Sequence, residues 1–165
     1  MQIFRGSVFM ARWLLLGVVS CVLLTGVLGQ AETKRILFFA GPASHGWGSH
    51  QHPAGSVILA QALRKSGLDV RVDLTFDWPG SDLLEKMDAL VIYSDGWDKH
   101  PATEHLDDLE NFMNRGGGLS VIHWATGIGG KDLWTKKEVT QEAVRVQWRG
   151  LMGADFEPWH SVSVI

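Results

Sequence analysis

Hydrophobic positions along this chain gather into short runs that are separated by polar and glycine-rich segments. Four runs have the composition of strands, and they are Arg35–Gly41, Leu68–Leu74, Ala89–Ser94 and Gly118–His123. Most are apolar without alternation, which is typical of strands buried on both faces of a parallel sheet. In the run from Leu68, apolar and charged residues alternate, which predicts a strand nearer the sheet edge.

Helical patterns lie between these runs. The expected helices are Ala54–Lys65, Ser81–Met87, Pro101–Arg115 and Glu138–Met152. Strand and helix therefore alternate, which predicts an α/β fold with three layers, a parallel sheet and right-handed crossovers. The last residues, Ser161–Ile165, also have strand character, and the chain stops within them. We therefore expect a C-terminally truncated domain whose further strands would follow Ile165.

The N-terminal segment has the pattern of a secretory signal. Arg5 and Arg12 precede the uncharged apolar stretch Trp13–Leu28, and Gly29–Ala31 offers small residues at the positions that a signal peptidase reads. This predicts a signal peptide at residues 1–31, and a periplasmic or extracellular domain at residues 32–165 without stable membrane association. Two alternatives remain open, namely an uncleaved anchor through residues 13–28 and a lipoprotein lipidated at Cys21.

Composition narrows the chemistry of the expected mature chain. Removing residues 1–31 leaves 134 residues and takes away two of the 15 basic residues but none of the 18 acidic ones, so the net charge moves from −3 to −5. This balance disfavours nucleic acid and anionic membranes as partners. The only cysteine is Cys21, so the mature chain has no disulfide, no thiolate nucleophile and no cysteine metal ligand.

Histidines follow three of the expected strands. His45, His50 and His52 share the loop after the first strand, while His100 and His123 follow the strands from Ala89 and Gly118. Open α/β sheets bind ligands beyond the carboxyl ends of their strands. Imidazoles from three loops can fill three positions of a divalent metal such as zinc and leave a fourth for water or substrate.

Alternatives to a metal site stay open at this point. Asp95 or Asp98 could add an oxygen ligand to such a site, or the histidines could act as acids and bases without metal. In the alternative that gives these histidines no functional role, His50 and His52 are solvated loop residues and His123 is hydrogen-bonded to the backbone. A nucleophilic triad of Ser44, His45 and Asp95 is disfavoured because the sequence has no G-x-S-x-G elbow.

Tryptophans also lie near the strand ends. Trp47 and Trp97 are expected to line a pocket for a small carbohydrate, because indole rings stack on the apolar faces of sugars. Trp124 and Trp159 are expected to cap the core. The loop Gly41–Gly48 is neither a Walker loop nor a G-x-G-x-x-G fingerprint, so we expect neither nucleotide nor flavin. A flavin carrier of the flavodoxin type, with Trp47 and Trp97 beside the ring, is the less favoured alternative.

Several segments together resemble the trehalose-utilisation (ThuA-like) family. They are Gly41–Gly46, Tyr93–Gly96 with His100 and Pro101, Gly116–Ala125, and Leu151–Phe156 with Trp159. The resemblance implies a flavodoxin-like fold of the class I glutamine-amidotransferase-like kind, and a link to the catabolism of oxidised (keto) disaccharides. It also implies that His45, His100 and His123 are site histidines. His123 stands where amidotransferases carry their cysteine nucleophile, so the label describes the fold and not the activity.

The sequence thus favours an exported ThuA-like domain acting on a sugar by metal-assisted or histidine-assisted proton transfer. In this scheme His45, His100 and His123 are metal ligands or acid–base groups, and Asp95 orients one of them. Ser44, Trp47 and Trp97 contact the substrate. A non-catalytic carbohydrate-binding or interaction module is the alternative, and the sequence leaves enzymatic activity, the reaction and the oligomeric state open.

Overall fold

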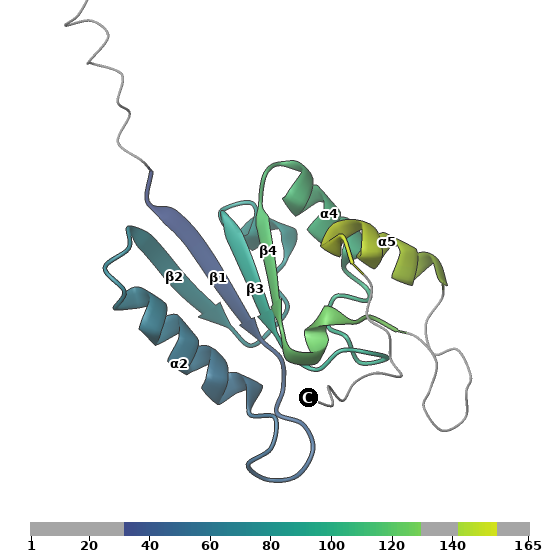
Figure 1. The fold of residues 1–165 in the computed structure, drawn as a ribbon. Coiled ribbons are helices and arrows are strands. Elements are labelled where there is room, and N and C mark those ends of the chain that lie inside the picture. Colours follow the sequence, from purple (N-terminus) through teal and green to yellow (C-terminus); the bar gives the residue numbers. More distant parts are fainter. Residues whose placement is uncertain (1–31, 130–141, 155–165) are drawn as a thin grey trace, which may run out of the picture. The chain divides into compact units, whose positions relative to one another are not determined.

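Four parallel strands form the sheet of this protein. The computed structural model describes residues 32–129 and 142–154. Its strands are β1 (Lys34–Ala40), β2 (Val70–Thr75), β3 (Ala89–Tyr93) and β4 (Gly118–Ile122), all parallel and in the order β2-β1-β3-β4 (Figure 1). This order is the flavodoxin-like one. The predicted α/β fold with a parallel sheet is therefore confirmed.

Helices alternate with the strands. They are α2 (His52–Arg64), α3 (Ser81–Leu84), α4 (Leu106–Asn114), α5 (Glu142–Met152) and the 3-10 turn η1 (His123–Thr126). In the described ranges, no helix combines the length and the apolar composition that a bilayer crossing requires. The predicted signal segment, the first residues of the predicted last helix and the strand Ser161–Ile165 lie outside the described residues.

Two helices, α2 and α4, begin at residues other than those predicted. α2 begins two residues early, at His52, with Pro53 in its first turn, where a proline needs no amide donor. α4 begins five residues late, because the segment from Pro101 first forms turns in which Thr103 N–H donates to His100 O and His105 N–H donates to Ala102 O. The delayed start leaves the segment after β3 as a loop at the carboxyl edge of the sheet.

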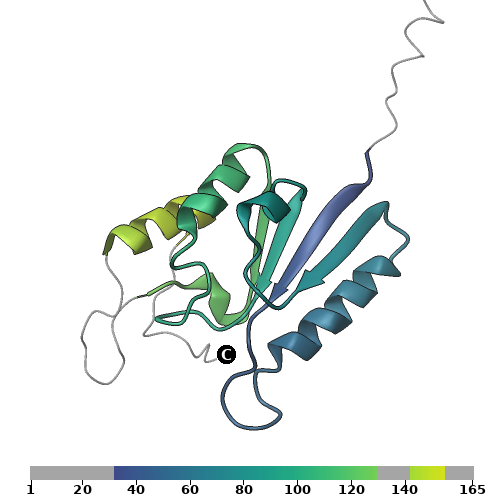
Figure 2. The same cartoon turned by 180° about the vertical axis from the view of Figure 1, so that it is seen from behind.

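Apolar side chains alternate between the two faces of the sheet. On β1, Leu37 and Phe39 pack on the side of α3, α4 and α5, together with Phe112 and Trp148. Phe38 points the other way and packs with Ala60 of α2 and Val72 of β2. Figures 1 and 2 show α2 on one face and α4 and α5 on the other. The three-layer arrangement predicted from the continuous apolar runs is thus confirmed.

Candidate functional site

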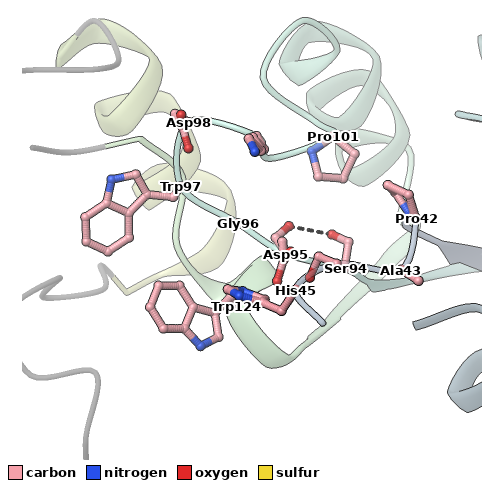
Figure 3. A pocket seen from close by; sticks show the side chains of 12 residues that line it. Pro42, Ala43, His45, Ser94, Asp95, Gly96, Trp97, Asp98, Pro101 and Trp124 are labelled. Atoms are coloured by element: carbon pink, nitrogen blue, oxygen red, sulfur yellow. Dashed lines mark hydrogen bonds between the residues drawn. The ribbon is translucent and has the colours of Figure 1, made fainter. Parts of the chain in front are cut away.

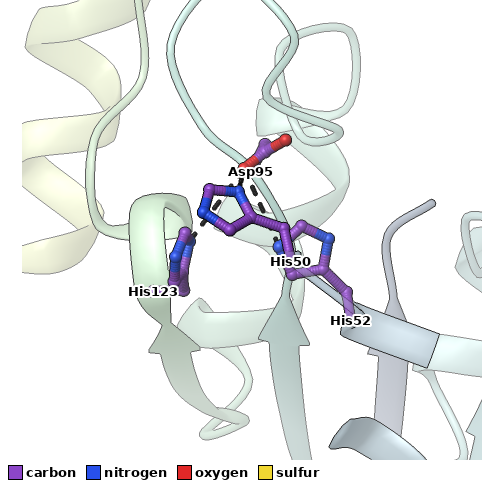
Figure 4. A group of neighbouring side chains, drawn as sticks. All are labelled: His50, His52, Asp95 and His123. Atoms are coloured by element: carbon purple, nitrogen blue, oxygen red, sulfur yellow. Dashed lines mark ion pairs between the residues drawn. The ribbon is translucent and has the colours of Figure 1, made fainter. Parts of the chain in front are cut away.

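Four side chains converge at the carboxyl edge of the sheet. His50 lies in the loop after β1, His52 is the first residue of α2, Asp95 follows β3, and His123 follows β4 (Figure 4). Each offers one nitrogen or oxygen atom, and these atoms all lie within 4.8 Å of one another. Strands β1, β3 and β4 are neighbours in the sheet. Their carboxyl ends therefore bring these residues together, although His50 and His123 are 73 positions apart in the sequence. We call these four residues the histidine–aspartate cluster.

Distances in the cluster are close to those of a metal site. Asp95 Oδ1 lies 3.3 Å from His50 Nδ1, 3.7 Å from His52 Nε2 and 4.0 Å from His123 Nδ1. Around a tetrahedral zinc with bonds of about 2.0–2.1 Å, two ligand atoms lie about 3.3 Å apart. Asp95 Oδ1 and His50 Nδ1 already have this spacing, whereas the other pairs, all within 4.8 Å, would have to draw closer around an ion.

His52 is the most constrained member of the cluster. Its side chain is fully buried, and its Nδ1 lies 2.8 Å from the carbonyl oxygen of Pro42. A carbonyl only accepts, so in the neutral ring Nδ1 carries the proton and Nε2 keeps a lone pair. Among the described residues this buried Nε2 has no hydrogen-bond partner. Metal-ligating histidines commonly donate their other ring N–H to a backbone carbonyl in this way.

His123 offers a second buried nitrogen without a partner. Its Nδ1 makes no hydrogen bond within the described part of the chain. Burial is the main cause that lowers the pKa of His123, and the neighbouring His50 and His52 lower it further, while Asp95 acts in the opposite direction. The ring is therefore neutral at neutral pH, which is the form that binds a metal ion.

Asp95 is held as a carboxylate. Burial alone would raise its pKa, but the hydrogen bond with Ser44 and the nearby His52 and His50 together leave the pKa below its usual value. Ser44 Oγ also lies 3.2 Å from His50 Nδ1. Ser44, expected to contact substrate, thus contacts two members of the cluster and orients them.

Strained backbone concentrates in the same loops. In the described ranges, the non-glycine residues with positive φ are His45 (61°), His50 (38°), Trp97 (66°) and His123 (70°). Such conformations cost of order 1–3 kcal/mol each and persist where the surrounding structure over-determines them, often at functional sites. His123 follows β4 directly and begins the 3-10 turn η1.

Gly96 allows the loop after β3 to approach η1 closely. A Cβ at this position would overlap the carbonyl oxygens of Trp124 and Gly127. We expect Gly96→Ala to lower the free energy of unfolding by roughly 2–3 kcal/mol, because two backbone segments must separate. Urea denaturation measures this loss. Gly150→Ala is the matched control, since nothing lies within 4 Å of its Cβ position in α5 and alanine favours a helix. Equal stability of the Gly96 variant and the wild type would contradict the close approach.

The remaining expected ligands lie elsewhere. His45 is exposed, with its ring centroid 4.2 Å from that of His50. His100 is buried, and both its ring nitrogens bond to backbone, Nε2 to Ala125 O and Nδ1 to Ala102 N. Of the expected set His45, His100 and His123, the structure therefore brings only His123 into the cluster. The backbone-bonded alternative considered for His123 does not hold for its Nδ1, which has no hydrogen-bond partner among the described residues.

Two members of the cluster were expected to face water. That interpretation is wrong for His52, which the start of α2 turns into the protein, and the side chain of His50 is only 30% exposed. The sequence signal that could have identified them is the His50-x-His52 spacing at the start of a helix. This spacing lets both rings project from one short segment towards the same edge of the sheet.

A cavity of about 570 Å³ adjoins the cluster (Figure 3). Its size is within the range of about 300–1,000 Å³ that is usual for small-molecule sites. Asp95 belongs to both the cavity wall and the cluster, and other lining residues include Ser44, His45, Trp97, Asp98 and Trp124. The rings of Trp97 and Trp124 pack with centroids 5.7 Å apart and planes 33° apart. Trp47 does not line this cavity, because its side chain is fully exposed.

Comparisons of the chain with protein-family models, with curated proteins and with solved structures found no match.

Proposed function

We propose that the histidine–aspartate cluster binds a divalent metal ion such as zinc, and that this ion acts on a small carbohydrate-like molecule in the adjoining cavity. One observation carries the proposal. The buried Nε2 of His52 has a lone pair, no hydrogen-bond partner among the described residues, and Asp95 Oδ1 at 3.7 Å. An unpaired buried acceptor beside a carboxylate is costly unless a cation lies between them.

The donor set suits a metal ion of intermediate softness, such as zinc. Three imidazoles and one carboxylate are usual ligands of zinc and its neighbours in the first transition series. A divalent ion bound here would act as a Lewis acid: it would polarise a carbonyl oxygen and lower the pKa of a bound water. His50, His52, Asp95 and His123 would hold such an ion.

Residues of the cavity supply the remaining parts of the reaction that we propose. The indoles of Trp97 and Trp124 offer apolar faces on which a sugar ring can stack. The carboxylate of Asp98 can accept hydrogen bonds from the hydroxyl groups of the sugar. His45 lines the cavity together with Asp95, so its imidazole is placed to take or give a proton on a bound molecule. This supports acid–base chemistry next to a carbonyl.

Membership of the trehalose-utilisation-like family is part of the proposal. The parallel sheet in the order β2-β1-β3-β4 and the placement of His123 on the turn after β4 support it. Membership would link the protein to oxidised disaccharides, and the sequence pattern of residues 1–31 supports export. Cys21 is the only cysteine and precedes the described residues, so the proposed chemistry does not use a thiolate in the cluster.

A non-catalytic carbohydrate-binding module is the second candidate. The aromatic lining of the cavity favours it, because Trp97 and Trp124 can stack on a sugar whether or not a metal is bound. Sugar binding that persists in chelator, with no chemical change of the sugar in the metal-loaded protein, would favour this candidate over the enzyme.

Metal analysis of the purified full-length chain tests the proposal. We expect about one equivalent of a divalent transition metal per chain, its loss on dialysis against chelator, and its return when zinc or cobalt is added. Cobalt gives visible absorption bands whose intensity reports the ligand number. A chain that neither retains metal nor gains these bands with added cobalt would contradict the proposed site.

A further inference from the structure

His100 lies outside the histidine–aspartate cluster but is the most fully bonded histidine of the carboxyl edge. It is 3% exposed. Ala102 N–H donates to its Nδ1 at 3.1 Å, so Nδ1 is unprotonated, and Nε2–H donates to Ala125 O at 3.0 Å. The two backbone groups thus select one neutral tautomer. Trp148 of α5 packs edge-on against the ring, with centroids 4.5 Å apart.

The bonded carbonyl belongs to the turn that carries His123. Ala125 is the third residue of η1, which begins at His123, and its N–H donates to Ser94 O at the end of β3. The Nε1–H of Trp148 donates to the carbonyl of Thr126, the last residue of the same turn. Three contacts from outside therefore hold this four-residue turn.

Such restraint is needed because the turn starts in an unfavourable conformation. His123 has φ of 70°, in the left-handed region that non-glycine residues rarely adopt. A conformation of this kind persists only when neighbouring contacts fix it. Without the contact of His100 with Ala125, the turn can relax, and the imidazole of His123 then leaves the direction in which its Nδ1 faces Asp95.

We propose that His100 is a positioning residue, whose neutral ring bridges Ala102 N–H and Ala125 O and so fixes the turn that presents His123 to the cluster. The role rests on the proposed metal function, since positioning matters through the ligand that is positioned. It assigns to His100 a function different from direct metal ligation. Outer contacts of this kind typically change metal affinity by 10–100-fold.

Cobalt titration of the full chain tests the role with three variants. His100→Met removes both ring nitrogens, and we expect cobalt affinity to fall by about 10–100-fold with altered visible bands. His100→Gln keeps a side-chain donor and acceptor, and is expected to stay within a few-fold of wild type. Val72→Ala, in the core on the opposite face of the sheet, loses stability but is expected to keep wild-type affinity and bands. Equal affinity of His100→Met and wild type would overturn the proposal.

A metal-free measurement separates this inference from the proposed function. The ring ¹⁵N resonances of His123, assigned by comparison with His123→Ala, are expected to shift in His100→Met and to stay in place in His100→Gln and Val72→Ala. Wild type that binds no cobalt would contradict the metal function alone, and unshifted resonances in His100→Met would overturn the positioning role.

If His100→Met does not fold, Trp148→Phe replaces it in both measurements. This variant removes only the indole N–H bonded to Thr126 O and keeps an aromatic ring. We expect a smaller shift of the His123 resonances and a few-fold loss of cobalt affinity. Wild-type behaviour of Trp148→Phe in both measurements would then overturn the positioning role.

Discussion

Replacing His52 by alanine is expected to abolish binding of a divalent metal, with a loss of affinity greater than about 100-fold. The fully buried ring is oriented by the Pro42 carbonyl, so no other side chain can take its place. Removing a ligand exceeds the 10–100-fold effect of removing an outer contact. His123→Ala is expected to have the same effect with only a modest loss of stability, because its ring is partly exposed at a strand end. Calorimetric titration of chelator-treated protein with zinc measures both losses.

His45→Ala is the matched control for these variants. His45 contacts the ring of His50 but does not belong to the histidine–aspartate cluster. We expect it to keep metal affinity within a few-fold of wild type while impairing any proton transfer to a molecule in the cavity. Retention of full affinity by His52→Ala, or loss of affinity in His45→Ala equal to that in His52→Ala, would mean that the ligands are not those four residues.

The position of the site was predictable from sequence, because it follows from the strands. Continuous apolar runs identify β1, β3 and β4, and carboxyl ends of parallel strands meet at one edge of a sheet. Residues directly after those strands must therefore lie near one another. Asp95 and His123 follow their strands within two residues and were placed correctly at this edge.

The identity of the inward-facing histidines was not predictable in the same way. His45 and His50 lie in the eleven-residue loop (41–51) between β1 and α2, where backbone conformation and not periodicity decides which side chain turns inward. Both have positive φ, which no local sequence pattern indicates for histidine. The position of His100 outside the cluster was not predictable for a related reason. Its ring accepts Ala102 N–H, and the segment after it turns before α4 begins, so the side chain enters the core.

Acidification is expected to destabilise the metal-free protein through His100. Burial lowers the pKa of His100 to about 4, although its hydrogen bond to Ala125 O acts in the opposite direction. The unfolded chain has a histidine pKa of about 6.5 and so binds the proton first as pH falls. Stability from the neutral ring is complete above about pH 6.5 and is lost between about pH 6.5 and 4. The loss is on the order of 3 kcal/mol, which urea denaturation at pH 7.5 and 4.5 in chelator would largely reveal.

His100→Gln is the control that assigns this loss to one residue. Glutamine can hydrogen-bond to the same backbone groups but has no proton to gain in this range. All other ionisable groups are common to the two proteins, so the difference between their pH dependences isolates His100. We expect the variant to lose less stability on acidification than wild type by roughly 2–3 kcal/mol. Parallel stability curves for the two proteins would show that His100 can take up a proton without breaking its contacts with Ala102 and Ala125, contrary to its burial in the structure.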